Sequence, residues 1–154
     1  MKRIVKTALI ASALLASGSG AALAQAKPED VLTLRKSVMQ VIRANFGPIA
    51  ATAKGEANLD MAAIQLRANR FAVISSMSME VWAPGTGMDK LKDSKAKPEI
   101  WTKMDDFKAK GQKMIAEAQK LSEAAKGGSM DAVKAQVGEV GKACKSCHDD
   151  FRAE

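Results

Sequence analysis

The 154-residue sequence is poor in reactive side chains, with one histidine, two cysteines and no tyrosine. A metal centre built from several histidines is excluded, because His148 is the only one in the chain. A Ser/His/Asp hydrolase site would have to use that same residue. The cysteines are Cys144 and Cys147, and in an exported protein two cysteines would usually suggest a disulfide. The candidate chemistry is therefore concentrated in residues 144–148.

Strong strand signals and dense basic runs are missing as well. Runs of β-branched residues are short, whereas apolar residues recur at helical spacing, which predicts an all-α fold. Three of the 24 Lys and Arg residues precede residue 7 and all 17 acidic residues come later, so the remaining chain carries a formal charge of +4. Because its basic residues form no stripe, we predict no nucleic-acid partner. One predicted loop contains a group of lysines, which form either a solvated loop or a patch for docking a partner: Lys90, Lys92, Lys95 and Lys97.

The first residues have the features of an export signal. The basic residues at the start are Lys2, Arg3 and Lys6. An apolar run follows over residues 7–16, too short to span a bilayer as a mature helix, and Ala22-Leu23-Ala24 has the small-residue pattern that signal peptidase cleaves. We predict a signal peptide over 1–24, a mature domain over 25–154 in the periplasm, and no membrane insertion after signal removal. An uncleaved N-terminal anchor is the alternative.

Apolar residues at intervals of three and four predict four amphipathic helices. Their expected ranges are about 28–54, 60–81, 98–126 and 129–151, with one long loop over 84–97. The first helix is expected to continue through Gly47-Pro48, with an apolar face of Val31, Leu34, Val38, Ile42, Phe46 and Ile49. Four helices with mostly short connections predict an antiparallel up-down-up-down four-helix bundle.

The segment Cys144-Lys145-Ser146-Cys147-His148 matches the Cys-x-x-Cys-His motif for covalent attachment of haem c. On a helix, positions i, i+3 and i+4 share one face. Two thiols can then bond the two vinyl groups on one porphyrin edge while the imidazole binds iron. We therefore predict one haem c, covalently held through Cys144 and Cys147 inside one end of the bundle, with His148 as an axial ligand.

Two other uses of this motif fit less well. A redox-active disulfide of the thioredoxin type would place the motif at a helix N-terminus after a strand, whereas here it lies in the last turns of a C-terminal helix. A zinc site would need a carboxylate or water as its fourth ligand, because the chain offers only two cysteines and one histidine.

The second axial position of the iron is left open by the residues alone. A second histidine is not available, so the position is filled by methionine, by a weaker ligand or not at all. Arg35 and Met39 are related as i and i+4, so the arginine could pair with a haem propionate while the methionine points over the ring. Alternatively, Met39 fills the core and Arg35 is solvated.

Several segments spread over the mature chain resemble cytochrome c′, the class II c-type cytochromes. They are Lys27-Pro28-Glu29-Asp30, Leu34-Arg35-Lys36-Ser37-Val38-Met39, Lys54-Gly55-Glu56, Trp82-Ala83-Pro84-Gly85-Thr86, Lys97-Pro98-Glu99-Ile100-Trp101 and Cys144-Lys145-Ser146-Cys147-His148-Asp149-Asp150-Phe151-Arg152. Together they are far more specific than the haem motif alone.

The resemblance implies a five-coordinate iron with an apolar pocket on the side opposite the histidine. Met39 matches a bulky residue that covers the vacant position. Arg35 and Lys36 match positions that contact the haem near its propionates, and Arg152 matches a basic residue over the proximal face. The family implies homodimers formed through the first two helices, binding of nitric oxide and carbon monoxide, and roles in nitric oxide tolerance or electron transfer.

A low-spin alternative comes from relatives of the cytochrome c-556 type, which use a methionine of this first helix as sixth ligand. With both His148 and Met39 bound, the protein would be a plain electron carrier, and methionine ligation tends to raise the reduction potential. An enzyme is the third class. We predict no enzymatic activity, because the sequence offers no second titratable group with an obvious catalytic partner.

Overall fold

The helix boundaries follow from residues with recognised capping chemistry. The structure is a computed structural model that describes residues 26–154, so the predicted export signal lies outside the described residues. Helix α2 (Pro28–Lys54) begins with a proline and two acidic residues in its first turn, and ends at Gly55, whose φ of 80° favours glycine. Asp60 caps α3 (Met61–Met77) by accepting a hydrogen bond from the Ala63 backbone N–H at 2.7 Å.

The second half of the chain repeats this pattern. A short helix, α4 (Glu99–Thr102), precedes α5 (Met104–Lys126). Ser129 caps α6 (Met130–Phe151) through its hydroxyl, which accepts from the Ala132 backbone N–H at 3.3 Å. A 3₁₀ turn, η1 (Ser78–Glu80), continues from α3.

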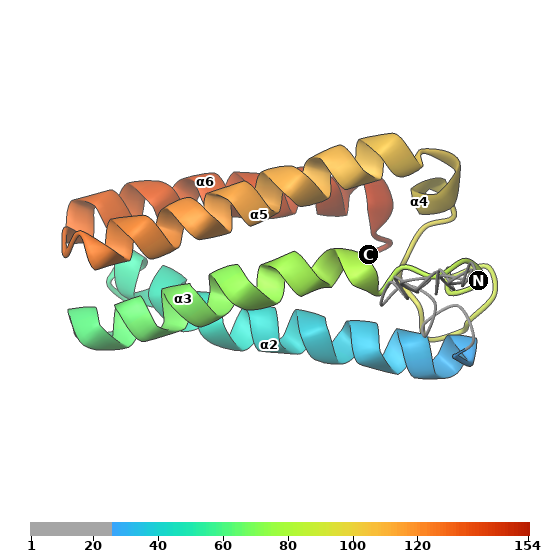
Figure 1. Cartoon of the computed structure of the whole chain (residues 1–154), viewed down its shortest axis with the longest axis horizontal. Helices are drawn as coiled ribbons and strands as arrows, with labels where there is room; N and C mark the ends of the chain where they lie inside the picture. Colours follow the sequence, from blue (N-terminus) through green and yellow to red (C-terminus); the bar gives the residue numbers. More distant parts are fainter. Residues whose placement is uncertain (1–25) are drawn as a thin grey trace, which may run out of the picture.

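The four long helices form two adjacent pairs, α2 with α3 and α5 with α6 (Figure 1). Each pair is joined by a short connection and is therefore antiparallel. The long segment between η1 and α4 crosses the end of the bundle that also carries α4 and the C-terminus (Figure 1). The predicted four-helix bundle is confirmed, as is the passage of the first helix through Pro48.

Two clusters of buried side chains fill the interior. The central core cluster is Ile49, Ile64, Ala68, Phe71, Ala118, Leu121, Ala125, Val133 and Val140. A smaller end cluster comprises Ala96, Ile100, Phe107 and Phe151, with Met79, Trp82, Trp101 and Met104 packed against it. Gly111 allows a close approach here, because a Cβ atom on it would overlap the Met79 side chain.

The structure corrects three details of the sequence-based helices. The third predicted helix is interrupted at Lys103, whose φ of −123° and ψ of 46° are not helical. This break accompanies the packing of Trp101, whose indole N–H donates to the Trp82 carbonyl at 3.2 Å. The second helix ends at Met77 rather than near Val81. Leu34, expected on the buried face of α2, is 43% exposed.

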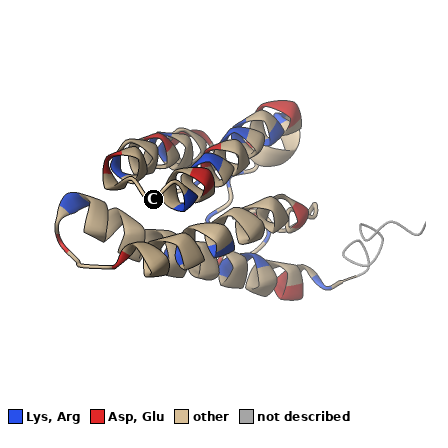
Figure 2. Ribbon diagram, turned by 60° about the vertical axis from the view of Figure 1, so that its left-hand side comes forward, with Lys and Arg blue, Asp and Glu red and all other residues tan. Residues whose placement is uncertain are grey.

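Most charged residues of the described part are on the outside of the helices, with Arg35 and Glu117 buried. Figure 2 shows Lys and Arg interspersed with Asp and Glu over both helix pairs. Among the helices of the described part, none combines the length and apolar character needed to cross a membrane.

Candidate functional site

The motif residues lie in the last two turns of α6, as the sequence predicts. Cys144 is half-buried and packs against the central core cluster, whereas Cys147 packs against the end cluster. Both cysteines are free, and burial raises the pKa of each thiol. Two separate inward-facing thiols on one helix face are what attachment of a porphyrin edge requires, so these residues fit haem c.

His148 follows directly on the same helix and its side chain is exposed. Desolvation by the neighbouring protein surface lowers the pKa of His148, and the positive charge of Arg152 lowers it further, while Asp149 acts in the opposite direction. The neutral imidazole is the form that binds metals. The histidine is therefore suited to act as an iron ligand beside the two thiols.

Aromatic rings form much of the end cluster beside Cys147. Phe107 contacts Phe151 edge to face, with ring centroids 5.3 Å apart, and Trp82 contacts Phe107 in the same manner at 4.8 Å. The Trp82 indole N–H donates to the Ser78 carbonyl at 2.6 Å, so its polar atom is satisfied and its ring is left to pack. This surface is apolar, as a haem pocket needs to be.

Arg35 is buried, with 4% of its surface exposed, which contradicts the alternative that it is solvated. Its guanidinium donates to the Thr86 hydroxyl at 2.8 Å, to the Thr86 carbonyl at 2.7 Å and to the Ser94 hydroxyl at 3.0 Å. It also lies 4.7 Å from the centre of the Trp82 ring. Burial lowers the pKa of Arg35.

The charge of Arg35 has no carboxylate partner among residues 26–154, where the ion pairs all involve lysines. A buried charge without a counter-ion is costly, and neutral hydroxyl and carbonyl groups compensate it only in part. The site therefore offers a preorganised cation to an anionic group.

Met39 lies one turn after Arg35 on α2 and is half-buried, whereas Lys36 is exposed. Ile42 follows Met39 by three residues and packs against the central core cluster, which Cys144 also contacts. Helices α2 and α6 are in contact. Met39 therefore lies on a helix that contacts α6, the helix of the motif. Whether the Met39 sulfur covers or binds the iron stays a prediction.

Arg152 caps the C-terminus of α6, and its side chain is exposed. Its backbone N–H donates to the His148 carbonyl at 3.0 Å, and it forms an isolated antiparallel bridge with Ala96. The long segment before α4 therefore pairs with the chain directly after His148.

Sequence reasoning missed the polar residues of that segment. Thr86 and Ser94 are buried, although they lie in what the sequence indicates as a solvated loop. The Ser94 hydroxyl accepts from Arg35 and from the Ala96 backbone N–H at 3.2 Å, and donates to the Thr86 carbonyl at 2.8 Å. No periodic pattern marks such residues, because their partners lie more than 50 positions away.

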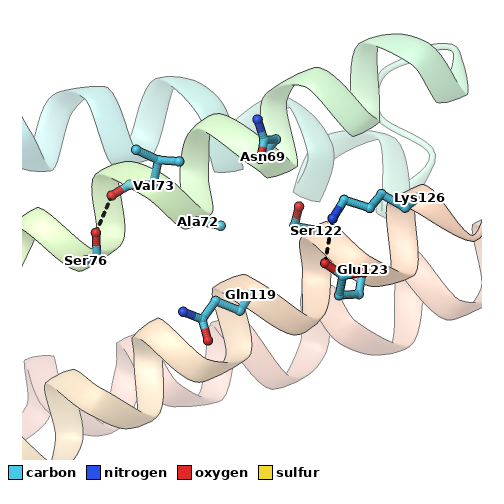
Figure 3. Close-up of a pocket in the computed structure, with 8 residues that line it drawn as sticks. All are labelled: Asn69, Ala72, Val73, Ser76, Gln119, Ser122, Glu123 and Lys126. Atoms are coloured by element: carbon cyan, nitrogen blue, oxygen red, sulfur yellow. Dashed lines mark hydrogen bonds and ion pairs between the residues drawn. The ribbon is translucent and has the colours of Figure 1, made fainter.

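Two hollows on the surface contain none of the predicted site residues. One is a groove of about 340 Å³ between α3 and α5 (Figure 3). It is lined by Asn69, Ala72, Val73, Ser76, Gln119, Ser122, Glu123 and Lys126. The second lies near the C-terminus and is lined by Lys97, Glu99, Lys103, Asp106, Asp149, Asp150 and Phe151.

Comparison with known proteins agrees with the site. The sequence profile of the family described as Cytochrome C' matches residues 30–152. A cytochrome c' of Cereibacter sphaeroides is 39% identical over 147 residues, covering 95% of this chain and 97% of that protein.

Solved structures give the same result. The solved structure described as cytochrome c' from Rhodobacter Spheriodes has a TM-score of 0.79 at 39% identity, covering 84% of this chain and 99% of that one. A nitric oxide complex of a mutant of cytochrome c prime from Alcaligenes xylosoxidans has a TM-score of 0.76 at 35% identity, covering 84% and 98%. The chain therefore belongs to the cytochrome c′ family, and its cofactor is haem c.

Proposed function

We propose that this protein is a periplasmic mono-haem cytochrome that binds nitric oxide and carbon monoxide at a five-coordinate iron and can also pass electrons. The observation that carries the proposal is the pair of inward-facing thiols beside His148, set against an apolar end cluster. The predicted leader over residues 1–24 supports the location, because haem c is attached to exported chains.

In this proposal Cys144 and Cys147 each add their S–H across one vinyl group, giving two thioether bonds. His148 supplies the axial nitrogen from the same helix. Bound haem provides an iron that takes up a diatomic gas or exchanges an electron. The protein's part is to hold the ring edge, to orient the imidazole and to keep water from the apolar end of the bundle.

The charged residues around the pocket receive roles by the same reasoning. Arg35 pairs with a propionate, since its buried charge has no carboxylate partner in residues 26–154. Lys36, exposed beside it, adds positive charge at the edge of the pocket. Arg152 lies one turn after His148 and provides positive charge on the proximal side.

Binding of nitric oxide is supported by two similar structures, each a nitric oxide complex of a cytochrome c prime variant from Alcaligenes xylosoxidans. Met39 on α2 is an unbranched thioether side chain, which cannot donate a hydrogen bond and can cover the sixth position without binding it. The proposal therefore places Met39 over the iron as a cover.

The second candidate is a low-spin electron carrier in which Met39 is the sixth ligand. Met39 is half-buried one turn after the buried Arg35, and this position is equally compatible with a bond from its sulfur to iron. It differs from the first candidate in a single bond, that between the methionine sulfur and iron.

Visible spectroscopy of the holoprotein separates the two candidates. We expect a high-spin ferric spectrum, carbon monoxide binding to the reduced protein, and little spectral change in Met39→Ala, because no iron–sulfur bond is lost. Met114→Ala is the matched control, since Met114 is also half-buried but lies on α5. A sulfur-to-iron charge-transfer band that disappears in Met39→Ala alone would establish the low-spin carrier instead.

A homodimer formed through α2 and α3 is also part of the proposal. Each helix exposes large apolar side chains at spacings that place them on one face: Leu34 and Val41 on α2, and Leu66, Val73 and Met77 on α3. Such a face on a water-soluble bundle is typical of a surface that another molecule covers.

A further inference from the structure

Lys110 of α5 forms a polar link to the haem-attachment motif of α6. Its ammonium group donates to the Ser146 hydroxyl at 2.7 Å and to the Ser146 carbonyl at 3.3 Å, and it forms an ion pair with Asp150 at 2.9 Å. Among the ion pairs of residues 26–154, this is the only one that joins two helices. Ser146 stands between the two cysteines of the motif, so Lys110 is held against the motif itself.

The ammonium group of Lys110 lies near the thiol of Cys147. Cys147 packs against the end cluster, which includes Phe107 of α5, and Phe107 contacts Phe151 of α6. Lys110 follows Phe107 by three residues, so both lie on the side of α5 that faces α6. Burial raises the pKa of the Cys147 thiol, and the positive charge of Lys110 acts in the opposite direction. The charge of Lys110 therefore acts on the sulfur atom that bonds the porphyrin edge in the holoprotein.

The two charges of this ion pair differ in their exposure to water. The Lys110 side chain is 26% exposed, whereas that of Asp150 is 53% exposed. The hydrogen bond to Asp150 raises the pKa of Lys110, so the ammonium group is protonated at neutral pH. Charges that are partly enclosed are screened less than exposed ones. Lys110 therefore acts on its surroundings more strongly than the opposite charge of Asp150 does.

We propose that Lys110 raises the reduction potential of the haem and that Asp150 lowers it by a smaller amount. The inference rests on the proposed function, which it deepens by naming residues that tune electron exchange. Reduction by an external one-electron donor removes one unit of positive charge from the haem and breaks no bond. A fixed cation beside the ring edge favours this loss of charge, whereas a carboxylate at the same place opposes it.

Spectroelectrochemical titration of the holoprotein at neutral pH tests the inference. Lys110→Met removes the charge and keeps an unbranched side chain. It is expected to shift the equilibrium about two- to fivefold towards the ferric form, the size of effect for one charge at a partly hydrated site. Lys110→Arg keeps the charge and should stay near the wild type. Lys126→Met is the matched control, because Lys126 also forms an ion pair on α5, with Glu123 at 2.7 Å, but lies at the opposite end of that helix.

Asp150→Asn separates the effect of charge from that of structure. It breaks the same ion pair as Lys110→Met, yet it should shift the potential upwards, because it removes a negative charge. A purely structural link would move the potential of both variants in the same direction. The inference is overturned if Asp150→Asn does not raise the potential, or if Lys110→Met lowers it no more than Lys126→Met does. Absence of carbon monoxide binding by the reduced wild type would instead contradict the proposed function, and it leaves the expected order of the potentials unchanged.

Discussion

A single buried carboxylate, that of Glu117, links the two helices of the second pair. Glu117 of α5 is 2% exposed and accepts hydrogen bonds from Lys113 at 2.7 Å, from Lys120 at 3.1 Å and from the Gln136 side chain at 2.6 Å. Gln136 belongs to α6, so this carboxylate fixes the register of the two helices. The bond to Lys113 is the main reason that the pKa of Glu117 is lowered to about 2.

The lowered pKa gives Glu117 a definite effect on stability against pH. Because the folded-state pKa lies below the unfolded value, ionised Glu117 stabilises the protein above about pH 4.5, and this contribution is lost as pH falls towards about 2. We expect Glu117→Gln to be less stable than the wild type at pH 7, with a difference that shrinks between pH 4.5 and 2. Urea denaturation followed by circular dichroism at several pH values measures this.

Glu123→Gln is the control for that experiment. Glu123 also pairs with a lysine, Lys126, at 2.7 Å, but its side chain is 70% exposed and its lysine partner lies on the same helix, α5. Exposed pairs contribute little to stability. The interpretation of Glu117 would be wrong if both variants showed the same small change, or if the Glu117→Gln difference were constant with pH.

At the scale of elements, the segment over residues 84–97 acts as a strap between the two helix pairs. On one side Arg35 of α2 holds Thr86 and Ser94. On the other side the segment pairs with the end of α6, where the Lys97 backbone N–H donates to the Phe151 carbonyl at 3.0 Å and the Ala153 N–H donates to the Lys95 carbonyl at 2.9 Å. The last turn of α6, which carries His148, is thus held from outside the helix.

Ser94→Ala tests the strap. The variant removes a hydroxyl that makes three hydrogen bonds and deprives the buried Arg35 of one acceptor. We expect a loss of about 1–3 kcal/mol in the free energy of unfolding, because a buried charged donor is left partly unsatisfied. Hydrogen exchange at the Lys97 and Ala153 amides should accelerate by a larger factor than at core amides, since the pairing with α6 loosens.

Ser37→Ala serves as the comparison for Ser94→Ala. Ser37 is exposed on α2, and its hydroxyl donates only to the Thr33 carbonyl within the same helix. Its loss should leave both stability and amide exchange near wild-type values. Unchanged exchange at Lys97 and Ala153 in Ser94→Ala would show that the strap does not depend on this hydroxyl.

At the scale of the whole molecule, the apolar face of α2 and α3 is the surface proposed to form the homodimer. Val41 is 45% exposed, Leu66 is 51% exposed and Val73 is 59% exposed. The double substitution Leu66→Glu and Val73→Glu should weaken self-association more than about tenfold, because a dimer would have to bury unpaired carboxylates. Sedimentation velocity of the holoprotein measures the change.

The control adds the same two negative charges to the other helix pair. Ala132 and Ala135 are both exposed on α6, so the double substitution Ala132→Glu and Ala135→Glu changes the net charge equally without touching the apolar face. A wild-type protein that sediments as a monomer at all concentrations would contradict the proposed dimer. Equal effects of the two double substitutions would show that another surface is used.

Local sequence was sufficient for most of the helix ends and for the haem motif. The caps at Asp60 and Ser129 and the stop at Gly55 act over a few residues, and the spacing of Cys144, Cys147 and His148 fixes their common face within one turn. Each of these features depends on neighbours in the chain, so helical periodicity and residue type are enough to predict it.

Tertiary structure decided the features that join distant segments. The burial of Arg35, its bonds to Thr86 and Ser94, the pairing of Ala96 with Arg152 and the ion pair between Lys110 and Asp150 all depend on contacts or enclosure that local periodicity does not encode. The break at Lys103 has the same origin, because packing of Trp101 overrides the helical propensity of its segment. The sequence alone thus determined which helix carries the haem-attachment motif, and only the packed bundle determined which polar groups are enclosed in the interior.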